Sequence, residues 1–144
     1  MIAIDSNVLV YAHRQDSPFH QSAIAQLDKY AGSRSPWAIP WPCLHEFFAV
    51  VTHPRIYASP SSPAEASEQV LAWLASPSVT AIGETPKHWQ RMSALLRDGG
   101  VVGGAIHDAR IAAICLDHGV SEILTLDRDF EQFDGLKVRR LTPE

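Results

Sequence analysis

Four acidic residues stand out because their immediate neighbours in the chain are apolar. Asp5 ends the apolar run of MIAIDSN, and Asp127 follows the apolar segment ILTL. Glu46 lies within PCLHEFFAVV, and Asp108 lies within GGAIHDARIAAICL. If these carboxylates met in the folded chain, they would repel each other unless a counter-charge were present. A divalent cation that prefers carboxylate and water oxygens, Mg²⁺ or Mn²⁺, is the natural counter-charge.

Such a metal site has a definite chemistry. A bound divalent cation lowers the pKa of its water towards neutrality and neutralises phosphate charge. In sites with two metals about 3.5–4 Å apart, the pair also holds the attacking and leaving oxygens of a displacement reaction. The acids therefore indicate hydrolysis at a phosphate, provided that the fold brings them together.

Each acid also has a simpler interpretation when it is considered alone. Asp5 could cap the helix that follows it, and Asp108 could favour the first turn of a helix through the backbone dipole. Glu46 could face solvent, and Asp127 could stabilise a turn in LDRDF, where Asp129 competes for any functional role. Only the tertiary structure distinguishes these alternatives from a shared site.

The elements that must position the acids follow from helix-start signals and apolar patterns. Ser17, Ser62 and Thr85 each precede a proline, the residue favoured at a first helical position, and Ser62 forms a capping box with Glu65. We expect helices over 6–14, 18–31, 43–52, 63–75, 86–98 and 105–118. We expect strands over 2–5, 37–40, 78–82, 122–126 and 137–141.

This alternation of strands and helices predicts an α/β fold. Its central twisted parallel sheet has about five strands and is flanked by helices on both faces. The runs IAI and ILTL are apolar without polar alternation, as buried parallel strands are. In such folds ligands bind beyond the carboxyl ends of the strands, which is where Asp5 and Asp127 are expected.

Composition narrows the class of protein. The chain has 144 residues, 46% hydrophobic and 19% charged, which predicts one globular domain over 1–144. No apolar stretch approaches the roughly 20 residues that span a bilayer, and the first residues do not resemble a signal peptide, so we expect a cytoplasmic protein. Cys43 and Cys115 form no CxxC pair and are expected to be buried free thiols.

The net charge of −4 gives no broad basic face for nucleic acid. A nucleic-acid substrate would therefore depend on bound metal or on local arginines. Arg110 and Arg128 lie near the acids in the sequence and are the candidates for contacts with an RNA backbone, although solvated surface is the simpler interpretation for each.

The segments MIAIDSNVLVYA, HDARIAA and ILTLDRDF, together with the isolated Glu46 after a WP turn, closely resemble the PIN domain. More narrowly, they resemble the VapC-type toxins of bacterial toxin–antitoxin pairs, from the first residue almost to the last. The resemblance implies a PIN-like fold and a Mg²⁺- or Mn²⁺-dependent endoribonuclease that inhibits translation.

The resemblance also implies residue roles. Asp5, Glu46 and Asp108 match the three most constant acids of the family, and Asp127 matches the more variable fourth. Asp5 and Asp108 would contact metal directly, Glu46 would bind metal or orient the attacking water, and Asp127 would hold a second or water-bridged metal. Ser6, Asn7 and Thr125 are the implied supporting groups around the metal ligands.

The family further implies partners. These are a cognate VapB-type antitoxin with a basic residue that enters the acidic site, an RNA substrate that is transfer or ribosomal RNA, and a second copy of the chain in a homodimer; no membrane partner is implied. Two other functions remain open. A non-catalytic PIN-fold module could bind RNA or protein, and a phospho-receiver domain also has acids at strand ends. The receiver, however, would need an acidic pair at the first strand and a late lysine.

Overall fold

A five-stranded parallel β-sheet forms the centre of the computed structural model, which describes residues 1–142. The strand order is β3-β2-β1-β4-β5, and every neighbouring pair is parallel. The strands are β1 (Ile2–Ile4), β2 (Trp37–Pro40), β3 (Val79–Ile82), β4 (Glu122–Thr125) and β5 (Lys137–Arg140). The predicted PIN-like α/β class is confirmed, and each strand lies within its expected range.

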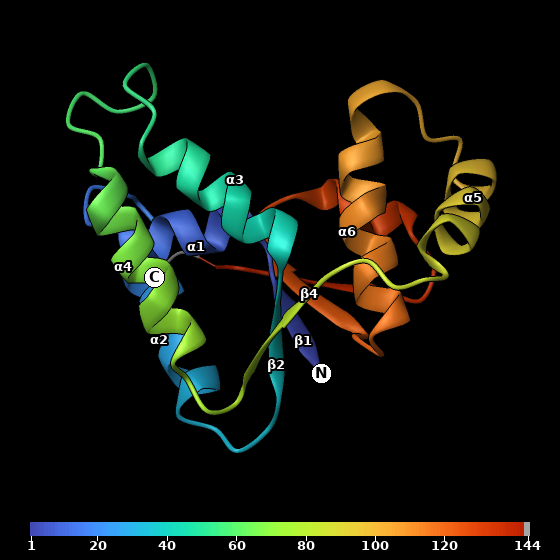
Figure 1. Ribbon diagram of the computed structural model, residues 1–144, viewed down its shortest axis with the longest axis horizontal. Helices are drawn as coiled ribbons and strands as arrows, with labels where there is room; N and C mark the ends of the chain where they lie inside the picture. The colour runs from blue at the N-terminus through green and yellow to red at the C-terminus, as the bar shows by residue number, and fades with distance from the viewer. Residues whose placement is uncertain (143–144) are drawn as a thin grey trace.

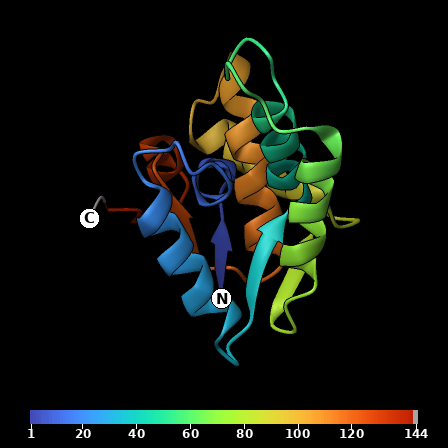
Figure 2. The ribbon, with the colours of Figure 1, turned by 90° about the vertical axis from the view of Figure 1, so that its left-hand side faces the viewer.

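Helices cover both faces of this sheet. They are α1 (Ser6–His13), α2 (His20–Ala31), α3 (Trp41–Val51), α4 (Pro63–Leu74), α5 (His88–Asp98) and α6 (Ile106–Asp117), with short 3₁₀ segments η1 (Gly103–Ala105) and η2 (Arg128–Gln132). Helices α1 to α4 lie on one side of the strands, and α5 and α6 lie on the other (Figure 1). Figure 2 shows α2 and α4 on the near side, with β1 and β2 visible between them.

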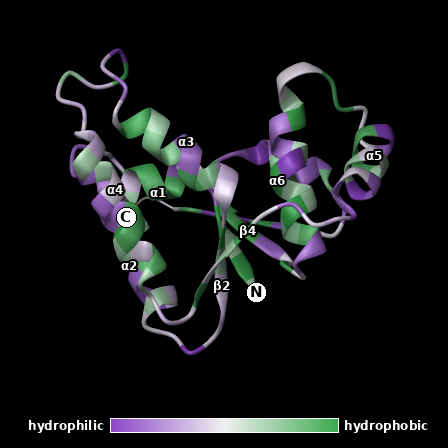
Figure 3. Cartoon of the chain, in the orientation of Figure 1, coloured by the Kyte–Doolittle hydropathy of each residue, from purple (hydrophilic) through white to green (hydrophobic). Residues whose placement is uncertain are grey.

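The two central strands are buried because helices cover both of their faces. Ala3, Ile4, Ile123 and Leu124 are at most 1% exposed. Figure 3 shows hydrophobic residues along β1, as expected for a parallel strand without a solvent face. A rigid apolar strand that ends in a carboxylate can therefore hold that charge at a defined place on the edge of the core.

Two of the three proline-linked helix starts differ from the prediction. Helix α4 begins at Pro63 with the expected capping box, in which Ser62 Oγ accepts from Glu65 N at 3.1 Å. Helices α2 and α5 begin two residues later than predicted. Ser17 Oγ instead accepts from Phe19 N at 3.2 Å, and Thr85 Oγ1 accepts from Lys87 N at 3.3 Å. Serine and threonine hydroxyls form such turns two residues ahead, so here the proline lies in a turn before the helix.

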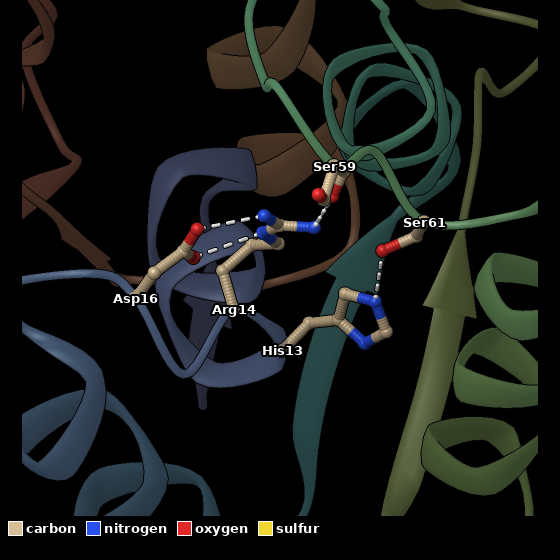
Figure 4. A network of polar contacts seen from close by, with 5 residues as sticks. All are labelled: His13, Arg14, Asp16, Ser59 and Ser61. Atoms are coloured by element: carbon tan, nitrogen blue, oxygen red, sulfur yellow. Dashed lines mark hydrogen bonds and ion pairs between the residues drawn. The ribbon is translucent and has the colours of Figure 1, made fainter.

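The long connection between α3 and α4 is attached to the end of α1 by a polar network (Figure 4). Arg14 forms a two-point ion pair with Asp16 at 2.7 and 3.0 Å and donates through Nη1 to Ser59 O at 2.9 Å. The ring nitrogen Nε2 of His13 lies 2.9 Å from Ser61 Oγ. These contacts fix the path of the chain into α4.

Two further expectations concern the whole chain. Cys43 and Cys115 are free and buried, as predicted. Within residues 1–142, no helix is both long enough and apolar enough to cross a membrane. The expected single domain over 1–144 stays a prediction, and its last two residues lie outside the described part.

Candidate active site

Asp5 lies at the carboxyl end of β1 and is only 5% exposed. Its Oδ1 accepts from Ser6 N at 2.7 Å, so it does cap α1. Its Oδ2 accepts a hydrogen bond of 2.7 Å from Oγ1 of Thr125, the last residue of the neighbouring strand β4. Burial raises the pKa of Asp5 above its ordinary value, while the hydrogen bonds from Thr125 and Ser6 partly oppose that shift. The helix cap and the proposed metal ligand are therefore compatible, because the cap occupies only Oδ1, and Oδ2 keeps a second lone pair beside its hydrogen bond from Thr125.

Thr125 connects the ends of β1 and β4 through a single fully buried hydroxyl. This hydroxyl donates to Asp5 and accepts from Asn7 Nδ2 at 3.3 Å and from Asp127 N at 2.9 Å. Asn7 Oδ1 in turn accepts from Leu126 N at 3.3 Å. Since the hydroxyl has one proton to donate, these partners fix its direction towards Asp5. The predicted supporting residues Asn7 and Thr125 thus lie in one network with the first acid.

Three acids meet on the side of the sheet that α6 covers. One carboxylate oxygen each from Asp108, Asp127 and Asp129 lies within 4.8 Å of the others. Asp108 occupies the first turn of α6, and Asp127 Oδ1 accepts from Asp129 N at 2.8 Å. The sequence did not decide whether Asp127 or Asp129 is the fourth acid of the site. The structure brings both of them close to Asp108.

The charge in this cluster is unfavourable without a cation. Partial burial, followed by the nearby carboxylates of Asp127, Asp5, Asp129 and Glu46, raises the pKa of Asp108 from 3.8 to about 6. A cation site without its cation typically contains a carboxyl group whose pKa is raised by neighbouring carboxylates.

Glu46 holds a different position from the other acids. It is an exposed residue of α3, on the opposite face of the sheet from α6. Its charge contributes to the raised pKa of both Asp5 and Asp108, so it lies near them. Like Asp5, it is not one of the three acids whose oxygens lie within 4.8 Å of each other. This arrangement suits a ligand that approaches the metal, or its water, from the other side of the crevice.

The position of the acids in the fold has a topological reason. Strands β1 and β4 are neighbours, but the helices that follow β1 and those that precede β4 lie on opposite faces of the sheet (Figure 1). A crevice forms beyond the carboxyl ends of two such strands, and ligands of α/β folds bind there. Asp5 and Asp127 follow these two strands directly.

The described donors fit a hard divalent cation. They are carboxylate oxygens, which Mg²⁺ and Mn²⁺ prefer. Ligand oxygens at about 2.1 Å from Mg²⁺ lie at most about 4.2 Å apart. Small side-chain rotations therefore convert a cluster within 4.8 Å into a coordinating one.

Sequence reasoning missed one contact of the first acid. Cys43 is fully buried on α3, and its Sγ lies 3.6 Å from Asp5 Oδ1. Burial and the charge of Asp5 raise the pKa of this thiol well above its ordinary value, so it stays protonated and can donate. The sequence contained one signal for this contact, because Cys43 lies about one helical turn before Glu46 and so shares a helix face with a predicted site residue.

The two candidate arginines differ in their surroundings. Arg110 forms an ion pair with Glu84 at 2.5 Å, and both side chains are partly exposed. Arg128 is exposed at the start of η2, next to Asp127. Their role in RNA binding stays a prediction.

The PIN domain family model matches residues 2–136 of the chain. The chain belongs to the PIN domain family. Among curated relatives, Ribonuclease VapC43 of Mycobacterium tuberculosis is 35% identical over 139 residues, which cover 96% of this chain and 94% of that protein. Ribonuclease VapC31 of the same organism is 33% identical over 143 residues, which cover 99% of each chain. Within the PIN family, the chain is therefore of the VapC type, as its sequence motifs predicted.

Solved structures with the same fold include VapBC2 and VapC20. VapBC2 of Rickettsia felis, bound to a DNA fragment from its promoter, matches with a TM-score of 0.71 and 18% identity over 99% of this chain and 100% of that chain. VapC20 of Mycobacterium tuberculosis, a toxin that cleaves the sarcin–ricin loop, matches with a TM-score of 0.69 and 16% identity over 96% and 99%. At these identities the similarity supports the PIN fold alone.

Proposed function

We propose that this PIN domain is a metal-dependent endoribonuclease and the toxin of a toxin–antitoxin pair. The observation that carries the proposal is the meeting of Asp108, Asp127 and Asp129, whose oxygens lie within 4.8 Å of each other, close enough to Asp5 for its charge to raise the pKa of Asp108. Relatives that are 33–35% identical over nearly the whole chain carry the name ribonuclease. An acidic crevice of this kind can accept an RNA phosphate only when metal offsets the negative charge.

In this proposal each acid has a role. Asp5 and Asp108 would hold Mg²⁺ or Mn²⁺, Glu46 would bind it or orient the attacking water, and Asp127 would hold a second or water-bridged ion, with Asp129 beside it. When bound, the metal supplies a water of lowered pKa and neutralises the charge of the phosphodiester.

The supporting residues act by holding the acids in place. Thr125 fixes one oxygen of Asp5, and its own orientation is set by Asn7 and by the backbone of Asp127. Ser6 fixes the other oxygen through its backbone N–H at 2.7 Å, with its hydroxyl at 3.5 Å. Such outer hydrogen bonds typically change metal affinity or activity by about 10- to 100-fold.

The proposal includes partners. The Rickettsia felis protein is a VapBC complex, and FitAB bound to a DNA fragment has the same fold with a TM-score of 0.70. By analogy, a VapB-type antitoxin would neutralise this chain, and an arginine of the antitoxin could occupy the acidic crevice in place of metal. The substrate is transfer or ribosomal RNA, and the chain forms a homodimer.

Cleavage of transfer and ribosomal RNA by the purified chain tests the function. We expect cleavage with Mg²⁺ or Mn²⁺ and none with EDTA. Asp5→Asn and Asp108→Asn should each lower the rate by about 100-fold or more, because metal ligands matter at least as much as the groups that support them. Asp98→Asn, at the exposed end of α5, is the matched control and should retain the parent rate.

The outcomes separate the alternatives. Cleavage that survives EDTA, or survives both site substitutions, would contradict the metal mechanism. RNA that is bound but stays intact with either metal would instead favour a non-catalytic PIN-fold binding module.

A further inference from the structure

The strand order determines which residues flank the acids at the carboxyl edge of the sheet. Strands β1 and β4, which lead into Asp5 and Asp127, lie in the middle of the order β3-β2-β1-β4-β5. Strand β2 lies on the far side of β1 and leads directly into Trp41. Strand β5 lies on the far side of β4 and ends at Arg140, which pairs with Thr125. Because neighbouring strands are about 4.8 Å apart, β2 and β5 are separated by about 14 Å along this edge.

The indole of Trp41 is packed against the protein on one side and exposed to solvent on another. A side chain on Gly83, the residue after β3, would meet Trp41 Cδ1 at 3.4 Å, so the indole lies against this bare backbone. The imidazole of His45 lies beside it, with ring centroids 6.4 Å apart. Trp41 is nevertheless 41% exposed, and it lines an open groove of about 410 Å³ together with His45 and Phe48. A tryptophan fixed on one side and open on the other can stack with a nucleobase.

Arg140 offers a guanidinium on the other side of the acids. Its Nη2 donates to Leu126 O at 3.2 Å, directly before Asp127 in the chain. This bond orients the side chain and uses only one of its five N–H donors. Arg139, the preceding residue, is instead held by Glu122 at 3.0 Å. Within residues 1–142, Arg140 forms no such ion pair, so its other donors can reach a phosphate.

We propose that a single strand of RNA crosses the carboxyl edge of the sheet between Trp41 and Arg140, with an unpaired base stacked on Trp41 and a backbone phosphate bound by Arg140. The acids lie between these two contacts, so the phosphodiester at the crevice is held on both sides. This inference rests on the proposed ribonuclease function and adds two RNA contacts outside the acids, Trp41 and Arg140. Single-stranded loops and bulges are the parts of RNA whose bases can be splayed onto aromatic side chains.

With metal in the crevice, charge favours RNA over a basic peptide as the ligand of this track. Without metal the acids attract a basic segment, such as the antitoxin arginine proposed above, but a bound divalent cation offsets their charge and Arg140 then repels such a segment. RNA is attracted by Arg140, and metal in the crevice balances its charge against the acids. The aromatic pair at the other end suits a base, whose flat face stacks irrespective of sequence.

Fluorescence anisotropy with a labelled, unstructured RNA oligonucleotide tests the track. The full chain carries Asp108→Asn so that the RNA stays intact, and binding is measured in Mg²⁺ over a range of salt concentrations. Trp41→Ala should weaken binding by about 5- to 100-fold without changing the salt dependence, and Trp41→Phe should restore most of it. Arg140→Ala should weaken binding and lower the slope of log K against log salt by about 0.7, the value for one phosphate contact with a single strand.

Two matched variants serve as controls. Trp89 is 66% exposed in the first turn of α5, and the Arg91–Asp117 ion pair ties this turn to the end of α6 opposite Asp108. Arg139 precedes Arg140 on the same strand. Trp89→Ala and Arg139→Ala should bind RNA like the parent. All four alanine variants should keep the parent Tm and, in chains that retain Asp108, the parent affinity for Mn²⁺. These measurements separate loss of the track from loss of the fold or of the metal site.

Four results would overturn the inference. The first is that Trp41→Ala and Arg140→Ala bind the single strand with the same affinity as the parent. The second is an equal loss in the two control variants, and the third is tighter binding of the same RNA annealed into a duplex. If Trp41→Ala loses a cognate antitoxin but keeps RNA, the groove is a protein-docking site and the track is likewise excluded. Failure of the proposed function is distinct, because it would appear as absence of cleavage by the unmodified chain.

Discussion

Asp5 Oδ1 accepts the first free backbone N–H of α1, while its Oδ2 accepts the hydroxyl of Thr125. The first contact is local in the chain, and the second joins two strands that are distant in sequence. A buried carboxylate with donors on both oxygens keeps one orientation, which a metal ligand requires. The thiol of Cys43 adds a weak third donor to Oδ1. The helix cap predicted from the sequence is thus part of the site rather than an alternative to it.

Asp108 is expected to make the metal-free protein less stable as pH rises. Its pKa is raised from 3.8 to about 6 in the folded protein, so the folded chain retains this proton to a higher pH than the unfolded chain. The loss of folding stability caused by ionising Asp108 is absent below about pH 4, grows up to about pH 6 and is complete above that value. Asp108→Asn should therefore raise the Tm in EDTA at about pH 7.5, and much less at about pH 4.5.

Circular dichroism melting at these two pH values checks this expectation. Asp98→Asn, on the exposed end of α5, should leave the Tm nearly unchanged at both. An equal rise for Asp108→Asn at both pH values would mean that the effect does not come from its ionisation.

At the level of elements, the sequence signals differ in how well they predicted the helices. The capping box at Ser62 placed the start of α4 correctly because it uses two reciprocal hydrogen bonds. A serine or threonine before proline, without the matching glutamate, also forms a turn, and this occurs at Ser17 and Thr85. The predicted starts of α2 and α5 were wrong for that reason, whereas their predicted ends were right.

The cap of α4 gives a prediction at this scale. Ser62→Ala removes the acceptor for Glu65 N and should lower the free energy of unfolding by about 1 kcal/mol, measured by urea denaturation. Ser67→Ala, on the exposed surface of the same helix, is the control and should stay within about 0.5 kcal/mol of the parent. A similar loss in both variants would mean that the cap contributes nothing specific.

At the level of the whole molecule, the site joins separate layers of the fold. Glu46 comes from α3 on one face, Asp108 from α6 on the other, and Asp5 and Asp127 from the sheet between them. A cation bound by these residues would link both helical layers to the strands. Metal binding and global stability should therefore be coupled.

Addition of Mn²⁺ tests this coupling. At about 100 times its dissociation constant, an ion that binds only the folded state stabilises it by about 2.7 kcal/mol. For a chain of this size, the Tm should rise by about 5 to 10 °C. Calorimetric scans of Asp108→Asn should show little of this rise. An equal rise in the variant would mean that the ion binds elsewhere.

The sequence by itself determined the elements, the parallel sheet and the set of acids. Caps, apolar runs and strand–helix alternation act between residues that are close in the chain, so they can be read without tertiary structure. The acids were recognised because a carboxylate in an apolar stretch needs a physical reason wherever it finally lies.

Only the tertiary structure decided which groups surround those acids. Asp5 and Thr125 are 120 residues apart and meet because β1 pairs with β4. Asp129 joins Asp108 because η2 packs against α6, and the packing of α3 brings Cys43 to Asp5. Strand order depends on the free energy of packing the whole core, because each possible order pairs the strands with different neighbours. No local pattern around any one acid contains that information.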